Sequence, residues 1–479
     1  MSTAQGSAGE SVIQRSRLST ALTAVAIFVS VWIVAALYWK TTYHLPTWRD
    51  LLLCGVALPM LLVVGLALGR RSIERIRQPE RVVQPSGQAP DTASSDDSAQ
   101  QWTMALLDSS LRLPSGITPE EIGEAAREAT VVTLHPDLTR HDGVRIFASE
   151  VASIAPDRFD ESLLPPNSAE AEALNDEHRR AMLLAVETLG ELMERQAGAA
   201  SADANISTEQ PSFKLHLLFP ERWQPVAATL AAWLDAHLAR EKWMPRMERV
   251  TPVCVADPVE ALTMLDRLNE VLHGQPLTTR HIVLALDSSL SRATVDSLDN
   301  LGQLYAQQRP NGHVLGEGAC ALLLAHPAAV DVVPAAQIHR LVASRLSAPI
   351  EQPDQQRGDA VMQLLDSARK HTAPELEIAA CALVSDADQR ISRRAEITAV
   401  AELAWPNSDT SGRCLHLGLA NGESSAVLAL SAIAVAGDHS LREQQPTFVV
   451  STSDATARGV MLVSLPQKPP APTNAPVSL

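Results

Sequence analysis

Two long apolar runs near the N-terminus interrupt the mixed hydrophobic and polar pattern of the chain. Leu18–Trp39 and Leu51–Gly69 contain no charged residue. Each run is close to the ~20 residues that a helix needs to cross the hydrocarbon core of a bilayer. A cleaved signal peptide is the alternative for the first run, but such peptides have a shorter apolar core and no second span at once behind them. The pattern therefore predicts a two-helix transmembrane hairpin over residues 18–69.

The charges that flank these runs predict how the hairpin is oriented. Arg15 and Arg17 precede the first run, and four arginines follow the second run between residues 70 and 77. The connecting loop carries only Lys40 and Arg49 as basic residues. Because Lys and Arg are enriched on cytoplasmic flanks, both termini are expected in the cytoplasm. Neither run contains an ionisable residue that would mark a transport path, so we interpret the hairpin as an anchor.

The rest of the chain divides into tails, a linker and one large domain. Residues 1–17 form a short cytoplasmic tail before the hairpin. Residues 70–105 join a basic juxtamembrane segment to a stretch rich in Pro, Ser, Gln and Asp, which predicts a flexible linker. Residues 106–466 contain the remaining apolar periodicity and predict a single cytoplasmic domain. Residues 467–479 hold four prolines and predict a disordered tail.

Within the large domain, apolar stripes at helical spacing alternate with short apolar runs. The stripes predict helices over Pro225–Glu241, over Pro258–His273 and near Ser424–Ala436. Strands without strict polar alternation, separated by helices, indicate a mostly parallel α/β sheet that is buried on both faces. The predicted strands are Phe213–Phe219, His281–Leu286, Ala319–Ala325, Ile378–Val384, Thr447–Ser451 and Gly459–Leu465.

Composition excludes several classes of function. The formal net charge is −16, and basic residues near the predicted spans leave the rest of the chain acidic. A nucleic-acid partner is therefore not expected, because phosphate binding requires a basic face. The five cysteines, at positions 54, 254, 320, 381 and 414, show neither CxxC pairs nor metal-ligand spacing, which argues against a disulfide framework and a zinc site. No nucleotide-binding, zinc-protease or nucleophile-elbow motif occurs, so neither a cofactor nor a metal is expected.

Several short motifs follow one another in a suggestive order. One apolar run ends in Asp-Ser, the next begins with Gly-Glu-Gly-Ala, a long helical pattern follows Asn-Gly-Glu-Ser-Ser-Ala, and STSDATARGVMLVSL closes the domain. In this order the segments resemble the β-ketoacyl synthase branch of the thiolase-like superfamily. The residues that carry the resemblance as fold motifs are Asp287, Ser288, Gly316, Glu317, Gly318 and Gly422.

The resemblance implies a fold and an assembly. Members of this superfamily consist of two similar halves, each with a five-stranded mixed sheet, stacked as a five-layer α-β-α-β-α domain. They often dimerise. The expectation is therefore an α/β, thiolase-like domain preceded by two transmembrane helices, with a homodimer through that domain.

The catalytic pattern of the family is incomplete in this sequence. Condensing enzymes use a cysteine at the N-terminus of a buried helix together with two histidines, or a histidine and an asparagine, that stabilise an oxyanion. Here the cysteine position falls at Val255, with Cys254 one residue away. One histidine position is occupied by Asn421, the other lies near Ser385-Asp386, and His416 stands near the position of a family lysine.

Cys254, Asn421 and His416 are thus weak catalytic candidates. A buried structural cysteine and a satisfied core histidine are the alternatives for two of them. Without a general base, little chemistry is left for a thiol, which at neutral pH is mostly protonated. The resemblance then indicates a degenerate, membrane-anchored member of the family.

Three functions remain open on these grounds. The first is a non-catalytic scaffold or adaptor that binds a protein partner at the cytoplasmic face of a bacterial inner membrane, as in the accessory proteins of type VI secretion. The second is a membrane-associated acyltransferase that uses Cys254. The third is a sensor that binds an acyl chain or an acyl carrier protein without turning it over. All three rest on analogy between folds.

Overall fold

The computed structural model describes the residues 101–166, 169–202, 212–241, 247–248, 252–329, 335–352, 358–406, 410 and 412–466. The predicted N-terminal tail, the transmembrane hairpin, most of the predicted linker and the predicted C-terminal tail lie outside these residues. Among the helices of the described ranges, none combines the length and the apolar character that a membrane span requires.

The N-terminal half is built on a mixed sheet. Its central strand β7 runs parallel to β4 and antiparallel to β8, and β8 is antiparallel to β1. The short strands β5 and β6 both lie parallel to β4 at the edge. The bounds are β1 Met104–Arg112, β4 Ser212–Pro220, β5 Met247–Glu248, β6 Val253–Val255, β7 Thr279–Ser288 and β8 Glu317–Ala325.

The C-terminal half repeats this pairing order. Strand β11 is parallel to β12 and β13, β13 is antiparallel to β14, and β14 is antiparallel to β10. Strand β9 pairs with both β14 and β1 and so joins the two halves. The bounds are β9 Ala336–Ile338, β10 Val342–Arg345, β11 Ala382–Ser385, β12 Cys414–His416, β13 Thr447–Ser451 and β14 Ala457–Ser464.

The prediction of a mostly parallel sheet is therefore wrong. The order β6-β4-β7-β8-β1 of the first half corresponds to β12-β11-β13-β14-β10 of the second, and each half contains antiparallel pairs on one side of its central strand. In the second half the connection over residues 452–456 is too short for a parallel crossover, which requires about a dozen residues.

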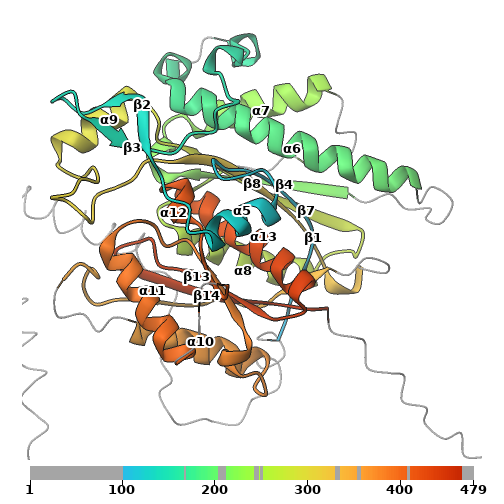
Figure 1. The fold of residues 1–479 in the computed structure, drawn as a ribbon. Helices are drawn as coiled ribbons and strands as arrows, with labels where there is room; N and C mark the ends of the chain where they lie inside the picture. Colours follow the sequence, from blue (N-terminus) through green and yellow to red (C-terminus); the bar gives the residue numbers. More distant parts are fainter. Residues whose placement is uncertain are drawn as a thin grey trace, which may run out of the picture. The chain divides into compact units, whose positions relative to one another are not determined.

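Helices cover both faces of each half. Figure 1 shows α6 and α7 above the first set of strands, α8 and α13 in the middle with α5 beside them, and α10 and α11 below the second set. The layers follow the order α-β-α-β-α. The bounds are α5 Pro119–Arg127, α6 Asp176–Ala202, α7 Ala227–Glu241, α8 Pro258–His273, α9 Arg292–Asn300, α10 Asp359–Thr372, α11 Ile391–Ala404, α12 Gly418–Asn421 and α13 Ser425–Glu443.

Smaller elements complete the described chain. A separate two-stranded sheet of β2 (Leu134–Thr139) and β3 (Arg145–Phe147) lies beside α9. The 3-10 helices are Pro156–Arg158, Glu161–Leu163, Ala169–Ala173, Glu221–Trp223, Pro327–Ala329 and Ile378–Ala380.

Alternate residues of each long strand belong to different cores. Val283 and Ala285 of β7 face the central helices, whereas Ile282, Leu284 and Leu286 pack with α6 and α7. Strands β13 and β14 divide in the same way between the central core and the core under α10 and α11. Because both faces of these strands are buried, their sequences are continuous apolar runs rather than alternating ones.

Two local predictions differ from the structure. The predicted strand Ile378–Val384 begins only at Ala382, because Ile378–Ala380 forms a 3-10 turn that closes with the Cys381 N–H on the Ile378 carbonyl. Strand β1 was not predicted, and its first residue, Met104, falls in the predicted linker. The polar Asp-Ser-Ser sequence at the centre of β1 interrupts the apolar run, although apolar residues on both sides of it are buried in the core.

Candidate functional site

The Gly-Glu-Gly-Ala and Asn-Gly-Glu motifs meet where the two halves of the domain cross. A Cβ atom on Gly316 would lie 2.2 Å from the carbonyl oxygen of Asn421. Gly422 has a φ of +67°, and a Cβ there would lie 2.5 Å from the carbonyl oxygen of Leu315. Both glycines are therefore required by the close approach of two backbones.

Asn421 is engaged at both ends of its amide. The side chain is buried, its Oδ1 accepts the Ser115 N–H at 3.0 Å, and its Nδ2 donates to the Leu417 carbonyl at 2.8 Å. The neighbouring carbonyl of Ala420 accepts the Ser149 hydroxyl at 2.9 Å. These bonds hold the short helix α12 in place, so they assign Asn421 a role in fixing the junction between the halves.

The acidic motif residues of the first half are also bound. Glu317 is fully buried and accepts hydrogen bonds from Arg180 Nε at 2.8 Å and from the Ser288 hydroxyl at 3.0 Å. Asp287 forms an ion pair with Arg222. Burial raises the pKa of Asp287, although the Arg222 guanidinium opposes that shift. Each buried carboxyl thus has a cationic partner, as the cost of burying charge demands.

Cys254 lies on the edge strand β6, before the helix at whose N-terminus the family places its nucleophile. It is partly buried against the core under α6 and α7. Burial raises the pKa of the Cys254 thiol, and the Glu221 carboxylate raises it further. The N-terminus of α8 is occupied by Asp257, whose carboxylate accepts the Glu260 N–H at 2.9 Å and pairs with Arg345 at 3.0 Å. The protonated thiol is favoured here.

His416 stands at the end of β12, with its Nδ1 atom 2.9 Å from the hydroxyl of Ser385 on β11. Burial lowers the pKa of His416 to about 4, and Arg394 contributes in the same direction. The ring is therefore neutral near pH 7 and is a weak base. Among the described residues, no hydrogen bond or ion pair joins Cys254 to Asn421 or His416.

Asp386 belongs to the neighbourhood Ser385-Asp386, where the resemblance leads one to expect a histidine, but the contacts of Asp386 were not predicted from the sequence. It is 1% exposed and accepts the backbone N–H groups of Thr452 at 2.7 Å and of Ser453 at 3.1 Å. The hydroxyls of Ser451 and Ser453 donate to it at 2.6 and 3.0 Å. Paired backbone donors of this kind could hold an oxyanion. Here a carboxylate of the chain itself occupies them.

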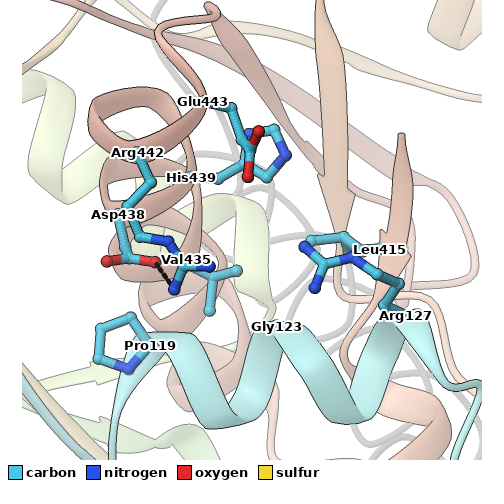
Figure 2. A pocket seen from close by; sticks show the side chains of 9 residues that line it. All are labelled: Pro119, Gly123, Arg127, Leu415, Val435, Asp438, His439, Arg442 and Glu443. Carbon is cyan, nitrogen blue, oxygen red and sulfur yellow. Dashed lines mark ion pairs between the residues drawn. The ribbon is translucent and has the colours of Figure 1, made fainter. Parts of the chain in front are cut away.

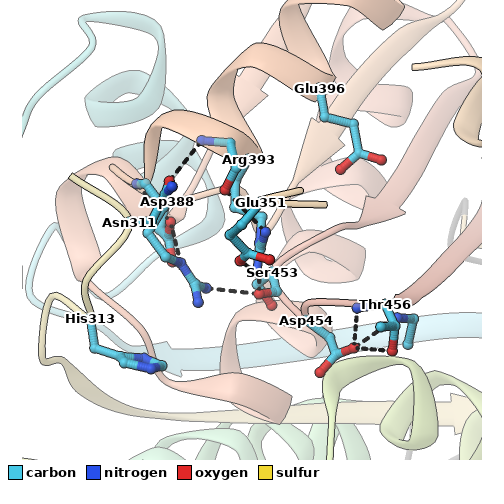
Figure 3. Close-up of polar contacts among 12 residues, drawn as sticks. Asn311, His313, Glu351, Asp388, Arg393, Glu396, Ser453, Asp454 and Thr456 are labelled. Atoms are coloured by element: carbon cyan, nitrogen blue, oxygen red, sulfur yellow. Dashed lines mark hydrogen bonds and ion pairs between the residues drawn. The ribbon is translucent and has the colours of Figure 1, made fainter. Parts of the chain in front are cut away.

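Two buried arginines brace the same turn between β13 and β14 from the other side. Arg390 bonds Asp388 through Nε at 2.8 Å and donates to the Ser453 carbonyl at 2.8 Å. Arg393 donates to that carbonyl at 3.1 Å and pairs with Glu351 at 2.8 Å. Figure 3 shows Asp388, Arg393, Glu351 and Ser453 gathered around the turn. The turn is thus held both by the carboxyl group of Asp386 and by the guanidinium groups of Arg390 and Arg393.

A shallow cavity between α5 and α13 offers little room for a ligand. Its volume is about 10 Å³, which is about the space of one water molecule. Figure 2 shows it lined by Gly123 and Arg127 of α5 and by Val435, Asp438 and Arg442 of α13. The Arg442–Asp438 ion pair at 3.5 Å lies within it. This cavity is too small for an acyl chain.

Comparison with known proteins places the fold. No family model and no curated protein matches the sequence. Among solved structures, the ishigamide ketosynthase/chain length factor is 16% identical with a TM-score of 0.51, covering 76% of this chain and 100% of that one. An oxazolomycin ketosynthase domain from Streptomyces albus JA3453 is 13% identical with a TM-score of 0.52, covering 77% of this chain and 75% of that one.

A third structure contains a type II polyketide synthase acyl carrier protein in complex with its ketosynthase. It is 13% identical with a TM-score of 0.50, and the match covers 76% of this chain and 100% of that chain. At these identities the likeness shows the fold alone. The predicted thiolase-like fold of the ketosynthase type is confirmed.

Proposed function

We propose that this chain is a non-catalytic, membrane-tethered scaffold whose ketosynthase-like domain binds a protein partner at the cytoplasmic face of a bacterial inner membrane. The observation that carries the proposal is the buried carboxylate of Asp386 on the backbone donors of Thr452 and Ser453. Condensation requires hydrogen-bond donors that are free to stabilise the negative charge that develops on the substrate oxygen in the transition state. Donors that already hold a carboxylate cannot serve a substrate.

The strength of these contacts supports the proposal. Burial raises the pKa of Asp386, and the hydrogen bonds from Ser451, Thr452 and Ser453 oppose that shift. A hydrogen bond within a protein contributes about 0.5–1.5 kcal/mol net. Asp386 accepts four of them, two from backbone N–H groups and two from hydroxyls. A substrate oxyanion would have to displace all of these and leave the buried carboxyl group of Asp386 without partners. The N-terminus of a helix can stabilise a thiolate. At the N-terminus of α8 the Asp257 carboxylate already accepts the Glu260 N–H, so this helix end does not stabilise a Cys254 thiolate.

Mass spectrometry of the intact full chain tests for chemistry. The purified protein in detergent is incubated with an acyl-coenzyme A and, separately, with an acylated carrier protein. We expect no thioester on Cys254 and no difference between the parent and Cys254→Ala. The matched control is Cys414→Ala, which removes a more deeply buried thiol. An adduct that appears in the parent and in Cys414→Ala but not in Cys254→Ala would establish the acyltransferase function instead.

Capture of a partner from native membranes tests the scaffold. The full chain and a form that lacks residues 18–69 are crosslinked in cells and their partners are compared. We expect one specific protein to be captured by both the parent and Cys254→Ala, and to be lost or reduced when the predicted spans are removed. Equal function and equal capture without residues 18–69 would contradict the tether. Components of a type VI secretion machine are the specific expectation that the family resemblance adds.

A carrier-binding sensor is the second candidate, and one comparison favours it. A ketosynthase of the same fold has been solved together with an acyl carrier protein. Calorimetric titration of the full chain with an unacylated and an acylated carrier protein distinguishes the two functions. The scaffold predicts no preference for the acyl group, whereas a sensor binds the acylated form more tightly. Light scattering of the same samples tests the proposed homodimer.

A further inference from the structure

The segment 302–314 between α9 and β8, which we term the docking loop, carries contacts from the first half to the second. It is closed on itself, because the His313 N–H donates to the Gln303 carbonyl at 2.7 Å and the Tyr305 N–H donates to the His313 carbonyl at 3.0 Å. Gly312 lies so close to Leu304 that a Cβ there would be 2.5 Å from the Leu304 carbonyl. The loop is therefore a compact unit held together by its own hydrogen bonds.

The docking loop caps the first turn of α11. The Ile391 N–H donates to the Pro310 carbonyl at 3.2 Å, and the Ser392 N–H donates to Asn311 Oδ1 at 3.0 Å. The side chain of Arg390, which precedes α11, supplies no cap of its own. Uncapped N–H groups at a helix start need partners from elsewhere. Here the loop of the other half supplies them.

One ion pair adds a charge to this docking. The ring of His313 contacts the carboxylate of Glu423, which stands at the turn between α12 and α13. Their side chains are 35% and 28% exposed, so solvent protons reach both. From the loop before α11, Asp388 and Arg390 face the ring, and Arg390 lies 3.7 Å from Glu423. From α11, Arg393 also acts on Glu423.

We propose that the docking loop is a pH-sensitive latch between the two halves, closed when His313 is protonated on Glu423 and loosened when His313 loses its proton. The other hydrogen bonds from the loop to the second half do not titrate. They join the Ile391 N–H to the Pro310 carbonyl, the Ser392 N–H to Asn311 Oδ1 and the Glu423 N–H to the Val314 carbonyl. His313 is thus the titratable group by which the loop senses pH. The inference stands whether or not the domain is catalytic.

The direction of the effect follows from the charges around the ring. Glu423 raises the pKa of His313 through its charge and its hydrogen bond, whereas burial and Arg390 oppose that shift and Asp388 assists it. A histidine with a raised pKa stabilises the closed state fully below its ordinary value of about 6.5. That stabilisation is lost as pH rises through the raised pKa. The latch therefore weakens as pH rises above about 6.5.

Hydrogen exchange of the full chain tests the latch. Peptides that cover residues 302–314 are followed from about pH 6 to about pH 9, and rates are divided by the intrinsic rate at each pH. We expect protection of the loop to fall several-fold over this range, while peptides from β8 keep their protection. In His313→Asn the protection should be low and independent of pH. A parent loop with constant protection would overturn the proposal.

Two further variants keep the result specific. Glu423→Gln should abolish the pH dependence as His313→Asn does. Because the two variants change different residues, poor folding of one of them does not decide the outcome. His141→Asn is the matched control, because His141 is exposed and pairs with Asp299 of α9, the helix that precedes the docking loop. It should leave the pH dependence of residues 302–314 unchanged. A pH response that survives in both His313→Asn and Glu423→Gln would also overturn the latch.

Discussion

Arg458 donates through Nε to Oε1 of Glu396 at 2.8 Å, and both side chains are excluded from solvent. The pair links β14 to α11 beneath the turn that Asp386 holds. A buried ion pair contributes little net stability compared with apolar groups, but removing one partner leaves an uncompensated charge. This difference can be measured.

Arg458→Met should therefore be strongly destabilising. Breaking a buried pair costs about 3–5 kcal/mol, since the Glu396 carboxylate would lose its cation. The double variant Arg458→Met with Glu396→Leu should recover much of that loss. Urea denaturation of each full-length variant in detergent measures the shift in midpoint. A double variant as unstable as the single one would show that the loss of stability comes from the surrounding polar turn rather than from the unpaired Glu396 carboxylate.

Gly316→Ala should disrupt the junction between the halves. The new Cβ would lie 2.2 Å from the Asn421 carbonyl oxygen, a distance that requires the backbone to move. Gly123→Ala is the matched control, because its Cβ would meet Val435 Cγ1 at an ordinary 3.5 Å. In helix α5 that change should stabilise by about 0.5–1 kcal/mol. Thermal melting compares the two, and a harmless Gly316→Ala would refute the close crossing.

Acid should weaken the Glu423 contacts only well below neutrality. Arg390 and His313 lower the pKa of Glu423 to about 2 despite its burial. A carboxyl with a depressed pKa contributes stability above its ordinary value of about 4.3, and this contribution is lost as pH falls through the depressed one. The difference in melting temperature between the parent and Glu423→Gln should be constant between about pH 5 and about pH 6.5, where His313 keeps its proton, and should shrink between about pH 4 and pH 2. A difference that shrinks already at pH 6 contradicts this assignment.

The cysteines should react slowly and in a defined order. Burial raises the pKa of Cys320, Cys381 and Cys414 to about 12, and Cys254 has a raised pKa but is more exposed. Because only the thiolate is nucleophilic, alkylation near pH 8 should modify Cys254 first among these four cysteines, and more slowly than free cysteine. Peptide mass spectrometry with iodoacetamide measures the rates. A Cys254 that reacts faster than free cysteine would indicate an activated thiol and would revive the acyltransferase.

Local patterns predicted much of the fold. The apolar stripe of Pro258–His273 coincides with α8, and the runs in β7 and β8 were recognised because strands buried on both faces need continuous apolar sequence. Strand directions were not predictable in this way, since apolar runs read alike in parallel and antiparallel sheets. Strand β1 was missed because its polar centre breaks the run.

The sequence by itself thus determined the long apolar elements, the glycine motifs and the family resemblance, because each depends on residues close together in the chain. Only the tertiary structure decided the site. Asp386 meets Thr452 and Ser453, and His313 meets Glu423, across separations of 66, 67 and 110 residues. No local periodicity encodes such pairs. They arise when two similar halves pack around α8 and α13 and bring distant loops together.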